Sequence, residues 1–194
     1  KCRGGGMMKM VEVKIKNKPN ELKAVAYLGG YSQHKGLLAE VIKTLDWFDE
    51  VDKKIRDVKD YPLSKNRSEL TSVYINNIVT DTVLAGIRQY SGKHPFVQVA
   101  NLDLSVLKYG VGGHYKWHVD AGTTLNRSLS VIITLNNDYE GGNLLFSPTQ
   151  EKEDQITIKP GVGKMIIWPS NFMYPHQVEP ITKGKRYSIV GWLW

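Results

Sequence analysis

Hydrophobic and polar positions alternate along most of the second half of the chain. From residue 96 onward, short apolar runs are separated by turns that contain Gly, Pro or Asn, a pattern typical of short β-strands. The runs that predict strands are 96–100, 102–109, 129–135, 143–147, 155–159, 164–168, 176–179 and 186–194. About eight short strands with no predicted helix between them favour a sandwich or a barrel.

The first half of the chain has a different periodicity. Apolar residues recur at helical spacing over 36–50 and again over 69–90, so each range predicts a helix. The apolar residues expected on the second helix are Val73, Ile78, Val83, Leu84 and Ile87. Near the N-terminus, Val11, Val13 and Ile15 alternate with polar residues and predict a strand. The expected fold class is α+β but mainly β, namely a double-stranded β-helix (jelly roll) core backed by N-terminal helices.

The stretch between the two predicted helices, residues 49–66, is rich in charged side chains and contains Pro62. Proline and dense charge both disfavour regular structure, so we expect a loop here. A solvated loop and a lid over a binding site are both compatible with this pattern. If the segment is a lid, it should become ordered when a peptide binds.

The composition narrows the candidate classes of protein. A chain of 194 residues, of which 41% are hydrophobic, can bury one sizeable core, so we expect a single domain over 8–194 with its core at about 96–194. Residues 1–7 are expected to be a leader or a remnant outside that domain. The chain has 1 Cys, so any metal would need His and carboxylate ligands. No apolar run is long enough to span a membrane, and we expect a cytoplasmic protein without a membrane partner.

The formal net charge of +7 raises the question of a nucleic-acid surface. Most of the excess lies in the first part of the chain, because residues 111–194 hold 8 basic and 7 acidic side chains. Binding to a nucleic-acid strand requires basic residues concentrated along one surface. The diffuse excess therefore argues against nucleic acid as a partner.

A candidate metal site begins with His118 and Asp120, which lie two positions apart. On a strand, residues at this spacing project from the same face. His176 is the natural third ligand, because it follows a turn that contains proline and begins a predicted strand. Two histidines and one carboxylate with open coordination positions suit non-haem Fe(II), which must also bind a co-substrate and O₂.

Arg186 lies on the next predicted strand after His176, and it shares a face with Ser188. Burying an unpaired guanidinium is costly, so an arginine that points into a barrel needs an anionic partner. A ligand carboxylate that accepts charge-assisted hydrogen bonds would meet this need. Two other arrangements remain open, in which Arg186 faces solvent or pairs with an acidic side chain such as Glu179.

Four segments of the second half carry a family resemblance. They are YGVGGHYKWHVDAG (109–122), RSLSVIITLNNDYEGGNLLF (127–146), PGVGKMIIWPS (160–170) and HQVEPITKGKRYSIVGWLW (176–194). In their order and spacing they resemble the Fe(II)- and 2-oxoglutarate-dependent dioxygenases, and among them the prolyl 4-hydroxylase type. The resemblance covers about 96–194.

The resemblance implies a role for each candidate residue. Fe(II) would be held by His118, Asp120 and His176. The co-substrate 2-oxoglutarate would be held by Arg186, at its distal carboxylate, together with Tyr109, Thr134 and Ser188. The substrate would lie near Arg127, Trp192 and Tyr115, for which a surface or packing role is equally compatible with the sequence.

The activity implied by the resemblance is hydroxylation of a prolyl residue in a peptide or protein. The reaction would use O₂, release succinate and CO₂ from 2-oxoglutarate, and depend on ascorbate as a reductant. The same chemistry on another side chain, a free amino acid or a nucleic-acid base is an alternative. A non-enzymatic jelly-roll binding module is an alternative from a different class, and a zinc hydrolase would leave Arg186 unexplained.

Overall fold

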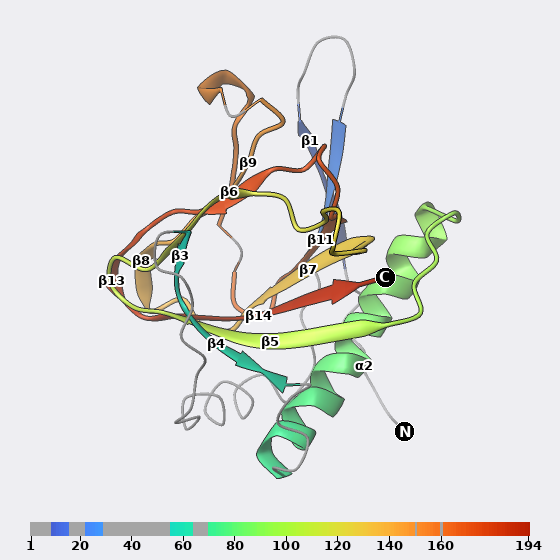
Figure 1. Ribbon diagram of the computed structural model, residues 1–194, viewed down its shortest axis with the longest axis horizontal. Coiled ribbons are helices and arrows are strands. Elements are labelled where there is room, and N and C mark those ends of the chain that lie inside the picture. The colour runs from blue at the N-terminus through green and yellow to red at the C-terminus, as the bar shows by residue number, and fades with distance from the viewer. Residues whose placement is uncertain (1–8, 16–21, 29–54, 64–69, 150, 160) are drawn as a thin grey trace.

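The computed structural model describes residues 9–15, 22–28, 55–63, 70–149, 151–159 and 161–194. The helix predicted over 36–50 and the leader predicted over 1–7 lie outside these ranges. Within them, two antiparallel five-stranded sheets face each other (Figure 1). This arrangement confirms the expected jelly-roll core. No helix among the described residues is long and apolar enough to cross a membrane.

The sheet that contains β6, called the β6 sheet below, carries the histidines of the candidate site. Its strand order is β10 (Ile156–Ile158), β9 (Leu144–Phe146), β12 (His176–Val178), β6 (His114–His118) and β3 (Arg56–Asp57). The opposite sheet, called the β14 sheet, carries Arg186. Its order is β11 (Met165–Pro169), β7 (Leu129–Thr134), β14 (Arg186–Leu193), β5 (Leu102–Tyr109) and β4 (Lys59–Pro62).

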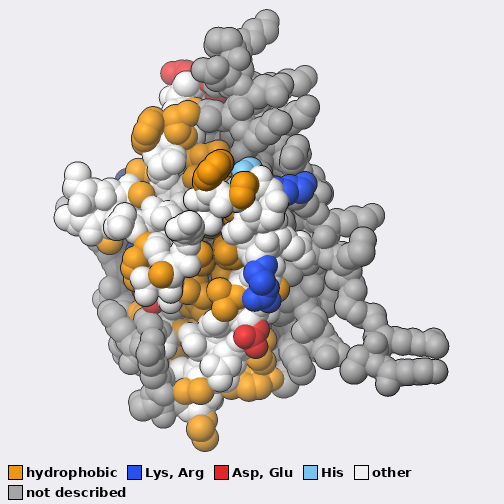
Figure 2. All heavy atoms as spheres, turned by 90° about the vertical axis from the view of Figure 1, so that its right-hand side faces the viewer, with side chains coloured by type: hydrophobic (Ala, Val, Ile, Leu, Met, Phe, Trp, Pro, Cys, Tyr) orange, Lys and Arg blue, Asp and Glu red, His pale blue; other side chains and the backbone are white. Residues whose placement is uncertain are grey.

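The described residues also form two short pairs of strands. The first is a hairpin of β1 (Lys9–Ile15) and β2 (Leu22–Leu28), which confirms the strand predicted from Val11, Val13 and Ile15. The second is β8 (Tyr139–Gly141) with β13 (Ile181–Gly184), at one end of the two large sheets (Figure 1). Figure 2 looks at the opposite side and shows hydrophobic side chains in a hollow with a histidine beside them.

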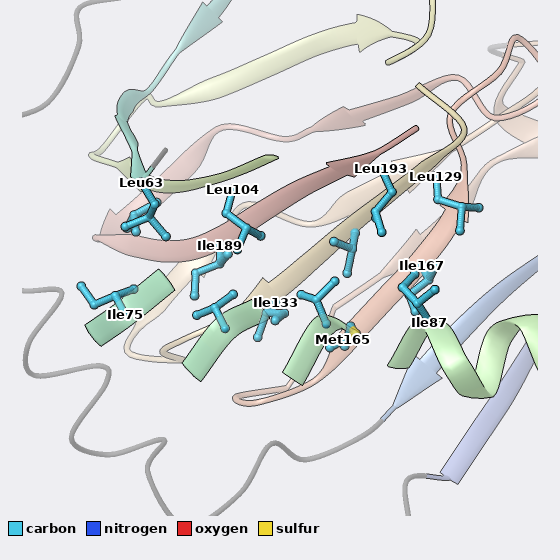
Figure 3. Packing of buried hydrophobic residues seen from close by; sticks show 14 of the residues in the cluster. Leu63, Ile75, Ile87, Leu104, Leu129, Ile133, Met165, Ile167, Ile189 and Leu193 are labelled. Carbon is cyan, nitrogen blue, oxygen red and sulfur yellow. The ribbon is translucent and has the colours of Figure 1, made fainter. Parts of the chain in front are cut away.

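The described residues form two buried apolar clusters, one on each face of the β14 sheet. One cluster fills the space between the two sheets and includes Tyr109, Ile132 and Trp168. The other lies between the β14 sheet and the helix α2 (Leu70–Lys93), as Figure 3 shows. Burial of apolar side chains on both faces explains why all six residues of β7 are buried.

α2 confirms the helix predicted over 69–90 and extends it by one turn. Its buried face is formed by Ile75, Val79, Val83, Ile87 and Tyr90, spaced by three or four positions. Val73 and Leu84 lie on the helix as predicted, but outside this buried face, because each is 37% exposed. They lie off the stripe, and local hydrophobicity does not distinguish them from it.

Three other sequence predictions need correction. The range 96–100 is not a strand, although the Ala100 amide donates to the carbonyl of Trp194. Residues 181–184 lie between two predicted strands, and they form a further strand, β13. Part of the charged 49–66 stretch forms β3 and β4, which pair with β6 and β5. These short strands are stabilised by partners far along the chain, which local patterns do not reveal. Residues 49–54 and 64–66 of the charged stretch lie outside the described residues.

Candidate active site

The three predicted metal ligands lie together. β6 and β12 are neighbouring strands, and their register places His118 opposite His176. Asp120 Oδ1 is 3.7 Å from His118 Nε2, and Asp120 Oδ2 is 3.4 Å from His176 Nε2. One ligand atom from each of the three residues lies within 4.8 Å of the other two. The group can therefore hold a single metal ion.

The local structure that positions Asp120 differs from the prediction. β6 ends at His118, so Asp120 does not lie on a strand beside it. The position of Asp120 is set by other contacts, including a hydrogen bond from the Ala121 amide to the Ser170 carbonyl at 2.9 Å. The spacing of two residues was the right signal, but the strand geometry assumed for it was wrong.

Both imidazoles are oriented by the backbone. His118 Nδ1 lies 2.7 Å from the Lys116 carbonyl oxygen, and His176 Nδ1 lies 3.1 Å from that of Tyr174. A carbonyl oxygen can only accept, so each Nδ1 carries the hydrogen and each Nε2 presents a lone pair. Two imidazole lone pairs beside one carboxylate are the donor set that a divalent transition metal requires.

The protonation states of the side chains also favour the binding of a metal cation. Burial, and to a smaller extent the neighbouring His176, lower the pKa of His118 to about 4 against an opposing effect of Asp120. Burial raises the pKa of Asp120, but the two imidazoles and the hydrogen bond from Ser130 outweigh it and leave the pKa below its usual value. At neutral pH the site therefore offers a neutral His118 and an ionised Asp120.

Aromatic rings enclose the histidines. The Tyr115 ring stacks on His118, with centroids 3.6 Å apart and planes 13° apart. The edge of Trp168 meets His176 at 5.0 Å, and Phe146 lies 5.5 Å from the same ring. These contacts restrict the rotation of both imidazoles and keep water away from one side of the site.

Arg186 begins β14 and is fully buried, with 0% of its surface exposed. Its three guanidinium nitrogens have no hydrogen-bond partner among the described residues. The two alternatives considered for it are thus wrong: it does not face solvent, and Glu179 accepts a hydrogen bond from Asn143 at 2.7 Å instead. Arg186 lies opposite Tyr109 in the strand register, with its guanidinium carbon 5.2 Å from that ring.

Two further polar groups near Arg186 also lack partners. Thr134 and Ser188 face each other across β7 and β14, and neither buried hydroxyl has a hydrogen-bond partner among the described residues. Burial raises the pKa of Tyr109 to about 12, so its hydroxyl stays protonated and can donate. Unsatisfied buried donors are costly, and a bound carboxylate would satisfy those of this group.

A pocket connects the metal-ligand group with Tyr109. Its polar lining includes Tyr109, His118, Asp120 and His176. The rest of the wall is largely apolar, formed by Leu107, Ile132, Leu144, Trp168, Val178, Val190 and Trp192, with Arg56 and Tyr115. Such a pocket can exclude water from a small polar ligand held at both ends.

The three residues expected near the substrate lie beside this pocket. Tyr115 and Trp192 both line it. Arg127 lies against Trp192, with its guanidinium carbon 3.9 Å from the ring centroid. The same guanidinium donates a long hydrogen bond of 3.4 Å to the backbone carbonyl of Asp120. Arg127 and Trp192 therefore form one unit at the edge of the site.

Sequence reasoning missed several residues of the site. Arg56 lines the pocket, pairs with Asp60 at 3.3 Å and lies 5.5 Å from the Tyr115 ring. Nothing in the charged segment around Arg56 distinguishes it from its neighbours. Ser130, which donates to Asp120, could have been noticed as a polar residue at an inward position of a predicted strand.

Comparison with known proteins agrees with this geometry. Residues 104–194 match the model of the 2OG-Fe(II) oxygenase superfamily, and this range contains all the site residues predicted from the sequence. A PKHD-type hydroxylase of Gloeothece citriformis is 28% identical over 163 residues, which cover 80% of this chain and 72% of the relative. Prolyl 3-hydroxylase 2 of Homo sapiens is 38% identical over 66 residues, which cover 34% of this chain. The chain thus spans only 9% of the length of this second relative.

Solved structures support the fold. The prolyl hydroxylase from Trichoplax adhaerens, in complex with a peptide fragment of the oxygen degradation domain of hypoxia inducible factor, aligns with a TM-score of 0.69 at 19% identity. The alignment covers 84% of this chain and 79% of that one. The match of residues 104–194 to the 2OG-Fe(II) oxygenase superfamily confirms the class of enzyme and the pair of cofactor and co-substrate, Fe(II) and 2-oxoglutarate, expected from the motifs.

Proposed function

We propose that this protein hydroxylates a prolyl residue in a peptide or protein. The observation that carries the proposal is the placement of a His118, Asp120 and His176 group and a buried, unpartnered Arg186 on the two facing sheets of one jelly roll. The prolyl substrate is supported by relatives whose names describe prolyl and PKHD-type hydroxylases. A solved neighbour that holds a peptide supports a peptide or protein substrate.

In this proposal the chain's residues hold and orient the reactants. His118, Asp120 and His176 bind the metal, and the backbone carbonyls behind both imidazoles keep Nε2 directed at it. Arg186 binds the distal carboxylate of 2-oxoglutarate with help from Tyr109, Thr134 and Ser188. When bound, Fe(II) and 2-oxoglutarate supply the oxidation, in which O₂ converts 2-oxoglutarate to succinate and CO₂ and delivers one oxygen atom to the substrate C–H bond.

The substrate side of the pocket suits a proline ring. Tyr115 and Trp192 present aromatic faces next to the proposed metal ligands, and the remaining wall is mainly apolar. A pyrrolidine ring has no side-chain hydrogen-bond donor, so it fits such a surface without leaving polar groups unsatisfied. Arg127, which packs against Trp192, would contact the backbone of a bound peptide.

The test is an assay with Fe(II), 2-oxoglutarate and a set of peptides that contain proline. We expect a mass gain of one oxygen atom on proline and a matching amount of succinate, both lost when 2-oxoglutarate is omitted. A matched set of peptides with alanine in place of proline is the control. Oxygen added to another side chain or to a free amino acid would contradict the prolyl substrate. Ascorbate dependence and a cytoplasmic location stay predictions from the sequence.

A further inference from the structure

Asp120 differs from the other two proposed metal ligands in how the fold holds it. His118 ends β6 and His176 begins β12, so both belong to paired strands. Asp120 lies past the end of β6 in a segment without regular structure. A carboxylate on such a segment can turn about its side-chain bonds, so a fixed orientation requires contacts from elsewhere in the fold.

Two buried serines supply these contacts. Ser130 Oγ donates to Asp120 Oδ2 at 2.6 Å, and Ser170 Oγ lies 2.8 Å from Ser130 Oγ. A serine hydroxyl has one hydrogen, and Ser130 gives it to Asp120, so the hydrogen of the second bond comes from Ser170. The hydrogen bonds thus run in one direction, from Ser170 to Ser130 to Asp120.

Both serines are held by the fold around them. Ser130 lies on β7 and faces Trp168 of β11 in the strand register. Ser170 directly follows β11, and its amide donates to the Ser128 carbonyl at 3.0 Å. The exposed fractions of Ser130 and Ser170 are 0% and 1%, so solvent does not compete for these hydroxyls.

We propose that Ser130 and Ser170 are positioning residues of the metal site. They hold the Asp120 carboxylate in one orientation toward the two imidazole nitrogens before a metal ion arrives. A ligand that is already oriented loses less conformational freedom on binding, so the pair increases metal affinity. The inference rests on the proposed function, because it assumes that Asp120 binds the metal.

The test uses the metal-free protein titrated with Co(II), whose visible absorption reports both affinity and coordination geometry. We expect Ser130→Ala to weaken Co(II) binding by about tenfold or more and to shift the absorption bands. Ser170→Ala should cause a smaller loss in the same direction, because Ser130 keeps its bond to Asp120. Ser130→Thr keeps a hydroxyl and should restore most of the affinity.

The matched control is Ser72→Ala. Ser72 is also 0% exposed and shares a hydrogen bond of 2.6 Å with the Tyr61 hydroxyl, but it lies on α2, away from the metal site. Its Co(II) affinity should stay within about twofold of the wild type. Thermal unfolding of every metal-free variant shows whether a loss of affinity reflects a loss of folding, and if Ser130→Ala does not fold, Ser170→Ala decides.

Co(II) affinity and absorption bands in Ser130→Ala and Ser170→Ala that equal those of the wild type would overturn the proposal. An equal loss in Ser72→Ala would also overturn it, because the effect would then reflect general stability. Asp120→Ala distinguishes this failure from a failure of the proposed function. If Asp120→Ala also binds Co(II) with the affinity of the wild type, the assignment of Asp120 as a metal ligand is wrong.

Discussion

Arg186 destabilises the ligand-free fold and is suited to bind an anion. Its guanidinium is buried and has no hydrogen-bond partner among the described residues, and the same holds for the hydroxyls of Thr134 and Ser188. Buried donors without acceptors destabilise a fold, and the effect is larger for a charged group. The arrangement is understandable if an anion binds there, because binding then recovers the free energy lost on burial.

The variant Arg186→Met tests this interpretation, because methionine has a similar length and no charge. We expect the free energy of unfolding of the ligand-free protein to rise by about 1–3 kcal/mol, as an unsatisfied cation is removed. The affinity for 2-oxoglutarate should fall at least about tenfold, or about 1.4 kcal/mol. Urea unfolding and calorimetric titration measure the two effects.

Lys183→Met is the matched control for Arg186→Met. Its ammonium is exposed and pairs with Glu140 at 3.1 Å on the surface, so stability should change by less than about 0.5 kcal/mol. A loss of stability in Arg186→Met together with unchanged 2-oxoglutarate binding would show that the guanidinium is already satisfied in the free protein.

At the scale of elements, α2 supports the site without touching it. The helix covers the face of the β14 sheet opposite to the pocket, and Figure 3 shows Ile75 and Ile87 directed toward that sheet. Gly86 allows this close approach, because a Cβ atom there would lie 2.6 Å from the Met165 sulfur. The helix thus stabilises the strand β14, whose other face carries Arg186 and Ser188.

A substitution in α2 should therefore reduce stability and leave ligand binding intact. Ile75 is 0% exposed, and Ile75→Ala should lower the free energy of unfolding by about 2–5 kcal/mol through the lost burial and the cavity left behind. Leu84→Ala is the control, with a much smaller loss, since Leu84 is 37% exposed. Urea unfolding measures stability, and Co(II) affinity of the folded protein should not differ between the two variants.

The short strands β3 and β4 allow a second prediction at this scale. Because they pair with β6 and β5, we expect their paired amides to exchange hydrogen slowly whether or not a peptide is bound. Thr123, Thr124 and Asn126 are exposed, and their amides serve as a fast reference in the same mass-spectrometric experiment; Gly122 and Leu125, whose amides bond to each other's carbonyls, are left out of it. If β3 and β4 instead exchange as fast as this reference and become protected when peptide is added, the result would support the alternative that the charged segment 49–66 acts as a lid over the site.

At the scale of the whole molecule, the two sheets contribute different parts of one site. The β6 sheet carries both proposed metal-binding histidines, whereas the β14 sheet carries Arg186, Ser188, Thr134 and Tyr109. A co-substrate bound to the metal and to Arg186 would therefore connect the sheets. Binding to the folded state alone stabilises that state by mass action.

The midpoint temperature of thermal unfolding should rise in two steps as the two ligands are added. Co(II) alone should stabilise the wild type, and 2-oxoglutarate at 100 times its dissociation constant should add about 2.7 kcal/mol. Arg186→Met should keep the Co(II) step and lose most of the 2-oxoglutarate step at the same concentration. An undiminished second step in this variant would mean that the dicarboxylate binds elsewhere.

The sequence by itself determined the fold class, the helix near 69–90, and the identity of four central residues of the site. Alternation, helical periodicity and short motifs are local patterns, and His118, Asp120, His176 and Arg186 were recognisable from them. Only the tertiary structure decided how these residues meet. β3, β4 and β13 exist through pairing with distant partners, Asp120 is held by Ser130 and Ser170 rather than by a strand, and Arg56 enters the pocket through β3. Such contacts join positions far apart along the chain, and their energies depend on distances and burial that a local pattern does not contain.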